Sequence, residues 1–189
     1  MITSEELETK LWEGANKLRG SMDASRYKDY MLGLMFYKFL SEKTLEGFIK
    51  GTRFDGSFSE AIEHYKKMFT EHEGQIKKLL MVTPGYYIEP QYLYFTWVQE
   101  INSGRFELQH VIDGITSFER MITGAQNADD FKDLFSTMNL NDPALGADLN
   151  MQSRNISELI LLFADLDIIA LQENDVIGDA YEYLKGSFA

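Results

Sequence analysis

The stretch from Tyr30 to Leu40, Tyr-Met-Leu-Gly-Leu-Met-Phe-Tyr-Lys-Phe-Leu, limits the fold of this chain more than any other feature. Nearly every position in it is apolar or aromatic, so a helix formed there is apolar on all sides. Such a helix is stable in water only when other elements surround it. Asp23 or Ser25 can cap its start. We therefore predict a central core helix that neighbouring elements cover on every face.

In the remaining sequence, apolar residues also recur at the three- and four-residue spacing of helices. The prolines stand at positions 84, 90 and 143, which leaves long stretches without a helix breaker. Ser57 and Glu60 form a capping-box pattern, and Pro90 and Pro143 suit first helical positions. The apolar faces expected are Leu7, Leu11, Ala15 and Leu18; Ala61, Tyr65, Phe69, His72, Ile76 and Leu79; Tyr94, Trp97, Val98 and Ile101; Leu108, Val111, Ile115, Phe118 and Ile122; Ile156, Leu159, Ile160 and Phe163; and Ile177, Tyr181, Leu184 and Phe188.

These patterns predict an all-α, multi-helix, bundle-like domain of about seven to nine helices. The stripe from Ala61 to Leu79 predicts a single helix of about five turns, and Asn155 with Glu158 predicts a later helix start. Tyr86-Tyr87-Ile88 is β-prone, which leaves open one short strand pair near residues 81–88. A chain of 189 residues can bury one sizeable core, so residues 1–189 are expected to be a single domain.

Charge divides the chain into a neutral helical part, residues 1–80, and an acidic helical part, residues 81–189. Residues 1–78 hold 13 basic and 13 acidic side chains, whereas residues 79–189 hold 5 and 17, which accounts for the net charge of −12. Because acidic surfaces repel phosphate, nucleic-acid contact is expected from the first part or from a partner chain. The candidates for DNA contact are Arg19, Arg26 and Lys28. The alternative is a solvated surface of ion pairs, because acidic residues interleave with these cations.

The residues give no sign of catalysis within this chain. Cysteine is absent, which excludes disulfides and thiolate metal sites, and neither G-x-S-x-G nor a glycine-rich phosphate loop occurs. Of the histidines, His72 is expected to be packed, and His64 and His110 solvated. With no converging ligand set, we predict no metal site. Residues 142–146, Asp-Pro-Ala-Leu-Gly, look like the acidic turn with which methyltransferases hold S-adenosylmethionine, but are interpreted as a helix start.

Four ordered blocks resemble a known family. Residues 11–41 contain a Trp, a Leu-Arg-Gly-x-Met-Asp turn and a Tyr-Lys-x-x-x-Leu-Gly-Leu helix, and they resemble the start of the modification subunit of type I restriction-modification systems. Residues 87–91, 131–146 and 175–184 are similar to later blocks of that family, in the same order. The break before Pro90 departs from the pattern at Glu89. The resemblance covers the whole chain.

The resemblance implies a helical N-terminal domain of an adenine-N6 DNA methyltransferase subunit, which assists DNA clamping and subunit assembly. It places the catalytic domain and the S-adenosylmethionine site beyond residue 189, so this chain is expected to be inactive alone and to hold no cofactor. The implied partners are a specificity subunit, a second modification subunit, optionally a restriction subunit, and double-stranded DNA. The alternative hypothesis is a stand-alone acidic helical module that binds other proteins and not DNA.

A cytoplasmic location is expected from the same sequence. The most apolar stretches, such as residues 156–170, are interrupted by charged residues and do not resemble membrane spans. The N-terminal residues, Met-Ile-Thr-Ser-Glu-Glu, have neither a basic region nor an apolar signal core.

Overall fold

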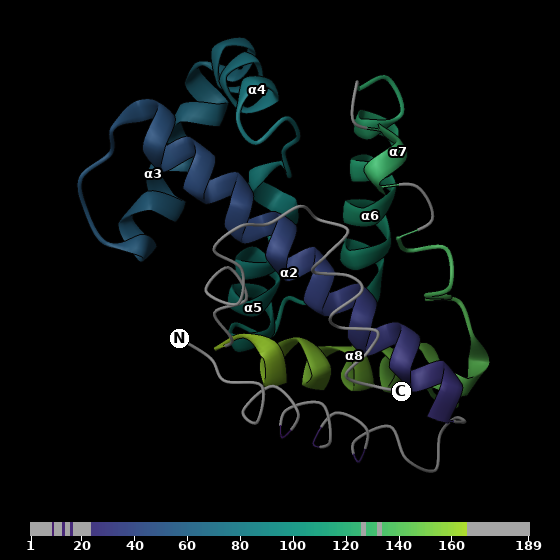
Figure 1. Cartoon of the computed structure of the whole chain (residues 1–189). Coiled ribbons are helices and arrows are strands. Elements are labelled where there is room, and N and C mark those ends of the chain that lie inside the picture. Colours follow the sequence, from purple (N-terminus) through teal and green to yellow (C-terminus); the bar gives the residue numbers. More distant parts are fainter. Residues whose placement is uncertain are drawn as a thin grey trace.

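The structure is a computed structural model that describes residues 24–125, 128–131 and 134–165, with Thr9, Glu13 and Asn16 (Figure 1). Its elements are α2 (Ala24–Thr52), α3 (Phe58–Glu71), α4 (Glu73–Val82), the 3-10 helix η1 (Pro90–Tyr92), α5 (Tyr94–Asn102), α6 (Leu108–Ile122), α7 (Ala128–Phe131), the 3-10 helix η2 (Pro143–Leu145) and α8 (Leu149–Phe163). The all-α prediction is confirmed. The helices expected around residues 7–18 and 177–188 lie outside the described residues.

The strand pair left open near residues 81–88 is not formed. Helix α4 continues through Val82, and a turn at residues 83–85 leads into extended chain without a strand partner in the described ranges. The β-prone residues Tyr86 and Ile88 are instead buried against the helices, at 2% exposure each. Their preference for a half-buried extended backbone is met by packing rather than by pairing.

Helix α2 is the central element, as predicted. It has 29 residues and runs through the middle of the molecule, with α3, α4, α5 and α8 in contact with it (Figure 1). The four consecutive residues from Leu34 to Tyr37 point about 100° apart around the helix axis, and all four are fully buried, so α2 is covered on every side. Burial of one such side chain contributes about 1.5–3 kcal/mol, so α2 supplies much of the favourable free energy of folding.

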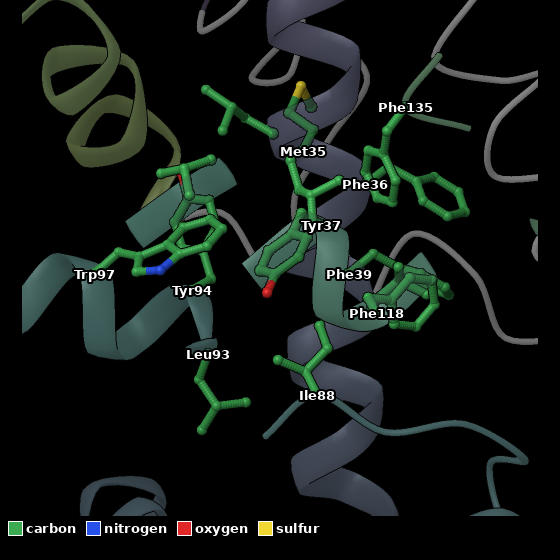
Figure 2. Close-up of a cluster of buried hydrophobic side chains, with 14 of the residues drawn as sticks. Met35, Phe36, Tyr37, Phe39, Ile88, Leu93, Tyr94, Trp97, Phe118 and Phe135 are labelled. Carbon is green, nitrogen blue, oxygen red and sulfur yellow. The ribbon is translucent and has the colours of Figure 1, made fainter. Parts of the chain in front are cut away.

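Aromatic rings connect α2 to helix α5 and to the irregular chain that follows α7 (Figure 2). The ring of Tyr37 on α2 stacks on that of Trp97 on α5, with centroids 4.4 Å apart. On its other side the ring of Phe135 lies edge-on at 6.1 Å. Gly114 lets α6 approach this stack closely, since a Cβ there would lie 2.8 Å from the Tyr37 hydroxyl and 2.9 Å from the Trp97 ring.

Residues 83–93, which we call the anchored segment, cross the core without regular helix or strand apart from η1. Hydroxyl groups on α2 satisfy two backbone N–H groups at and just after this segment. Thr44 Oγ1 accepts a hydrogen bond from Ile88 N at 3.2 Å, and Ser41 Oγ accepts one from Tyr94 N at 3.0 Å. Because a buried N–H without a partner is costly, these hydroxyls make the crossing possible.

Buried tyrosines satisfy carbonyl groups of the same segment. The Tyr37 hydroxyl donates to the Tyr92 carbonyl at 2.6 Å, and the Tyr65 hydroxyl on α3 donates to the Ile88 carbonyl at 2.7 Å. Burial raises the pKa of both phenols well above the ordinary value, so both remain protonated donors. The Tyr94 hydroxyl makes a third bond of this kind, to Ile160 O of α8 at 2.7 Å.

Two predicted helix boundaries are wrong. The single helix expected from Ala61 to Leu79 is divided at His72, where α3 ends and α4 begins. The nearby Gly74 has low helix propensity, and the apolar stripe alone did not reveal this break. Helix α8 begins at Leu149 rather than near Asn155, because Asp148 accepts a hydrogen bond from Met151 N at 2.8 Å and caps it. The capping box at Ser57 is confirmed.

Removing the Thr44 hydroxyl tests the role of the anchored segment. Thr44→Val keeps the side-chain shape but leaves the buried N–H of Ile88 without its acceptor. We expect the free energy of unfolding to fall by about 1–3 kcal/mol. The matched control is Thr70→Val on α3, whose exposed hydroxyl bonds only to the Lys66 carbonyl; it should change stability by less than about 0.5 kcal/mol. Equal effects in urea titrations of both variants would contradict this role.

Arg53 ends α2 in a conformation that favours glycine. Its φ is +54°, and the Phe54 N–H bonds to the Ile49 carbonyl at 3.1 Å while the Arg53 N–H bonds to the Lys50 carbonyl at 3.4 Å. This is the Schellman arrangement, in which glycine commonly takes the left-handed position. An L residue there costs about 1–2 kcal/mol.

We expect Arg53→Gly to leave the free energy of unfolding unchanged or to raise it by up to about 1 kcal/mol, because relief of the left-handed backbone outweighs the greater freedom of glycine in the unfolded chain. Arg53→Val, which places a β-branched side chain at the same φ, should instead lower it by at least about 1 kcal/mol. Thermal unfolding of the three proteins measures both changes. A lower midpoint for the glycine variant would show that the arginine side chain stabilises this end of α2.

Candidate nucleic-acid interface

The structure places the sequence-predicted DNA contacts at the start of α2. Arg19 lies outside the described residues, and Arg26 belongs to the first turn of α2. Lys28 follows two residues later and is half-buried. Residues two apart on a helix do not face the same side, so the backbone does not bring Arg26 and Lys28 together on one face. Their assignment as DNA contacts stays a prediction.

Further along α2, lysines form ion pairs within the helix. Lys38 and Glu42 make a buried pair, with exposures of only 2% and 7%, and the Lys38 ammonium lies 5.8 Å from the centre of the Phe95 ring. A charge at such a depth costs several kcal/mol when unpaired, so Lys38 has a structural role. The interpretation of the cations as a solvated surface of ion pairs therefore does not describe Lys38, whose pair with Glu42 is buried.

Glu46 binds two more lysines of the same helix. Its carboxylate lies 2.8 Å from Lys50 Nζ and 3.6 Å from Lys43 Nζ. Burial alone would raise the pKa of Glu46, but hydrogen bonds and charge attraction from the two lysines hold it below the ordinary value. Two cations share one anion, so this group keeps a net positive charge.

The structure also shows where the acidic part of the chain lies. From residue 83 to residue 165, the described basic residues are Arg105, Arg120 and Arg154. Acidic side chains outnumber them along α5, α6 and α8, and one pair, Arg154 and Glu158, lies within α8. A polyanion approaching these helices meets mainly like charge.

A groove between the N-terminal halves of α6 and α8 is a site that sequence reasoning missed. It has a volume of about 530 Å³. Its wall includes the amide or hydroxyl side chains of Gln109, Gln152 and Ser153, together with Leu149, which is 67% exposed. Amide and hydroxyl groups have no distinctive spacing in sequence, so no pattern signalled this groove. It offers hydrogen bonds and modest apolar contact but no assembled catalytic group.

The exposure of the histidines differs from the predictions. His72, expected to be packed, is exposed at the junction of α3 and α4 because the helix breaks there. His64, expected to be solvated, is half-buried and stacks on the Phe54 ring at 4.9 Å. His110 is half-buried and pairs with Glu100 of α5. In the part of the chain that the structure describes, no three potential ligands are grouped to hold a metal ion.

Residues 142–146 are a helix start, as interpreted, although a short one. Asp142 caps the 3-10 helix η2, since its carboxylate accepts a hydrogen bond from Ala144 N at 2.9 Å. Gly146 lies directly against α8, where an added Cβ would be 2.7 Å from Gln152 N. Close packing on α8 therefore accounts for this glycine, as the capping hydrogen bond accounts for Asp142, without a bound cofactor.

Among the described helices, none combines the length and the apolar character that a membrane span requires.

Comparison with known proteins extends these observations. A crystal structure of the type I restriction-modification system methyltransferase subunit from Streptococcus thermophilus superposes with a TM-score of 0.83 and 32% sequence identity, covering 99% of this chain and 39% of that one.

Two curated relatives are also similar over 97% of this chain. One is the type I restriction enzyme MpnII methylase subunit of Mycoplasma pneumoniae, with 28% identity over 35% of its length. The other is the type I restriction enzyme MjaIX methylase subunit of Methanocaldococcus jannaschii, with 26% identity over 31% of its length. The chain thus spans about a third of the length of the relatives it matches.

The family comparison agrees with the resemblance found in the sequence blocks. A family model described as the HsdM N-terminal domain matches residues 7–163, which include every helix from α2 to α8. The chain therefore belongs to the HsdM N-terminal domain family.

Proposed function

We propose that this domain serves an adenine-N6 DNA methyltransferase of the type I restriction-modification class, in which it helps to enclose DNA and to join the subunits. The observation that carries the proposal is the match of the whole described fold to a methyltransferase subunit at a TM-score of 0.83. The family match over residues 7–163 supports it. The stand-alone acidic module is not favoured, because full-length relatives place this fold within a methylase subunit.

In this proposal the domain acts as an accessory part and methyl transfer takes place elsewhere. S-adenosylmethionine would bind the complete subunit, since Gly146, the glycine of the sequence that resembles a cofactor turn, packs on α8. The proposed partners are a specificity subunit, a second modification subunit and double-stranded DNA, with a restriction subunit in the complete nuclease. The proposed location is the cytoplasm, where the DNA substrate lies.

The coding sequence after Ala189 gives a direct test. The proposal requires an Asn-Pro-Pro-aromatic motif in the same reading frame, because adenine-N6 methyltransferases hold the target base there. The subunit expressed with its specificity subunit should then transfer labelled methyl groups from S-adenosylmethionine to adenine in DNA. A stop codon directly after Ala189 would contradict the proposal.

Residues 1–189 alone should show no saturable binding of S-adenosylmethionine. The reason is that Gly146, in the turn that resembles a cofactor-binding motif, packs directly on α8. Isothermal titration of the chain with the cofactor measures this, with the assembled enzyme as the positive control. Stoichiometric binding by the chain would place the cofactor site within it and overturn the assignment.

Residues 1–189 alone should also bind duplex DNA weakly at about 150 mM salt, since the net charge of −12 opposes the few available phosphate contacts. A gel-shift titration at that salt tests this directly. Tight binding under these conditions would show that local cations outweigh the acidic helices, and would contradict the accessory role assigned to the domain.

A further inference from the structure

The C-terminal end of α2 meets α4 at one close crossing (Figure 1). A Cβ at Gly51 would lie 2.6 Å from Leu79 Cδ2, so the last turn of α2 packs directly on α4 at that point. Lys50 and Arg53 flank Gly51 in sequence, and Lys78 precedes Leu79. The chain thus carries three cations within two residues of the two contacting positions, and we call this group the α2–α4 cationic surface: Lys50, Arg53 and Lys78.

Each of these cations is exposed to solvent. Lys50 is 70% exposed in its side chain and shares Glu46 with Lys43. Arg53 and Lys78 are also exposed, and among the described residues neither has a carboxylate within ion-pair distance. The residues three and four positions from Lys78 on α4 are uncharged: Gly74, Gln75, Met81 and Val82. The positive charge of this surface is therefore only partly neutralised.

The backbone of Arg53 gives an independent reason to assign a function here. Its φ of +54° is a conformation in which glycine would complete the same helix end with less strain. Lys50 already supplies a cation to the C-terminal end of the α2 dipole. Residues that break a local rule in this way concentrate at functional positions. A solvent-facing guanidinium held on such a backbone is suited to bidentate contact with phosphate oxygens.

We propose that Lys50, Arg53 and Lys78 contact the phosphate backbone of double-stranded DNA, which rests on the proposed function and names the surface that serves it. The choice of partner follows from the distribution of charge. From residue 83 to residue 165 the described acidic residues outnumber the basic ones, so this part of the chain repels a polyanion. At the α2–α4 cationic surface, in contrast, Arg53 and Lys78 have no carboxylate within ion-pair distance among the described residues. Contacts of this kind position a protein on DNA without reading its sequence.

The experiment measures binding of a fluorescein-labelled duplex of about 30 base pairs to the 189-residue chain by anisotropy, from about 20 mM salt upward, where screening is weak. The variants are Arg53→Gly and Lys78→Gln, and the matched control is Arg105→Gln, an exposed arginine beside the α6–α8 groove. Each surface variant should weaken binding at least threefold at low salt, equally for duplexes of unrelated sequence. The slope of log K against log salt should become shallower by about 0.9 for each lost contact.

Arg53→Gly separates binding from folding, because glycine suits the left-handed backbone and the unfolding midpoint should not fall. Unchanged affinity in both surface variants, an equal loss in Arg105→Gln, or no duplex binding by the unaltered chain at low salt would overturn the proposal. Variants that bind DNA normally but no longer co-purify with the specificity subunit would show that this surface instead contacts an acidic protein, and would overturn it too. The methylation and reading-frame tests of the proposed function do not depend on these three residues. If the DNA-contact proposal fails, those tests still decide the proposed function.

Discussion

The fold depends on how α2 satisfies the polar backbone of a non-helical segment inside the core. Residues 83–93 pass across α2 with Ile88 and Leu93 buried at 2% and 0% exposure. Every buried N–H and carbonyl in such a crossing needs a partner. Thr44 and Ser41 supply acceptors, and Tyr37 and Tyr65 supply donors, so α2 and α3 replace the hydrogen bonds that a helix would make with itself.

This arrangement explains why the central helix is not purely apolar. Ser41 and Thr44 are fully buried, at 0% exposure. Without a partner, these polar side chains would only make the helix less apolar. With the anchored segment in place, the same hydroxyls fix the register of residues 83–93 on α2. That register sets the direction of α5, because the Tyr94 N–H at its start bonds to Ser41, and α5 in turn brings Trp97 onto Tyr37.

Much of the helical fold could be predicted from the sequence, because apolar periodicity and capping residues act locally. The central helix, the capping box at Ser57 and the apolar face of α6 follow from such patterns. The break at His72 and the cap of α8 at Asp148 could not be predicted in this way. Several residues near each position can end or begin a helix, and apolar periodicity does not show which of them does so. The course of residues 83–93 depends on hydroxyl contacts between positions up to 55 residues apart, as for Tyr37 and Tyr92, and no local pattern encodes them.

The candidate interface shows the same division. Sequence charge counts assign the acidic excess to the later part of the chain, but they cannot separate paired from unpaired cations. The structure shows Lys38 buried with Glu42 and leaves Arg53 exposed. No sequence pattern singles out Lys78, because the contact of its neighbour Leu79 with Gly51 arises only when α4 packs on α2. Family membership gives the domain its context, and packing determines which of its charges can meet a partner.

Native-state hydrogen exchange at the amides of Ile88 and Tyr94 tests the central claim most directly. Neither amide is bonded to another backbone group of a regular helix, and both donate to hydroxyls of α2. The account predicts that both exchange only through global unfolding, as slowly as amides in the middle of α2. Exchange as fast as that of solvent-exposed loop amides would contradict it, because the segment would then open without disturbing the core.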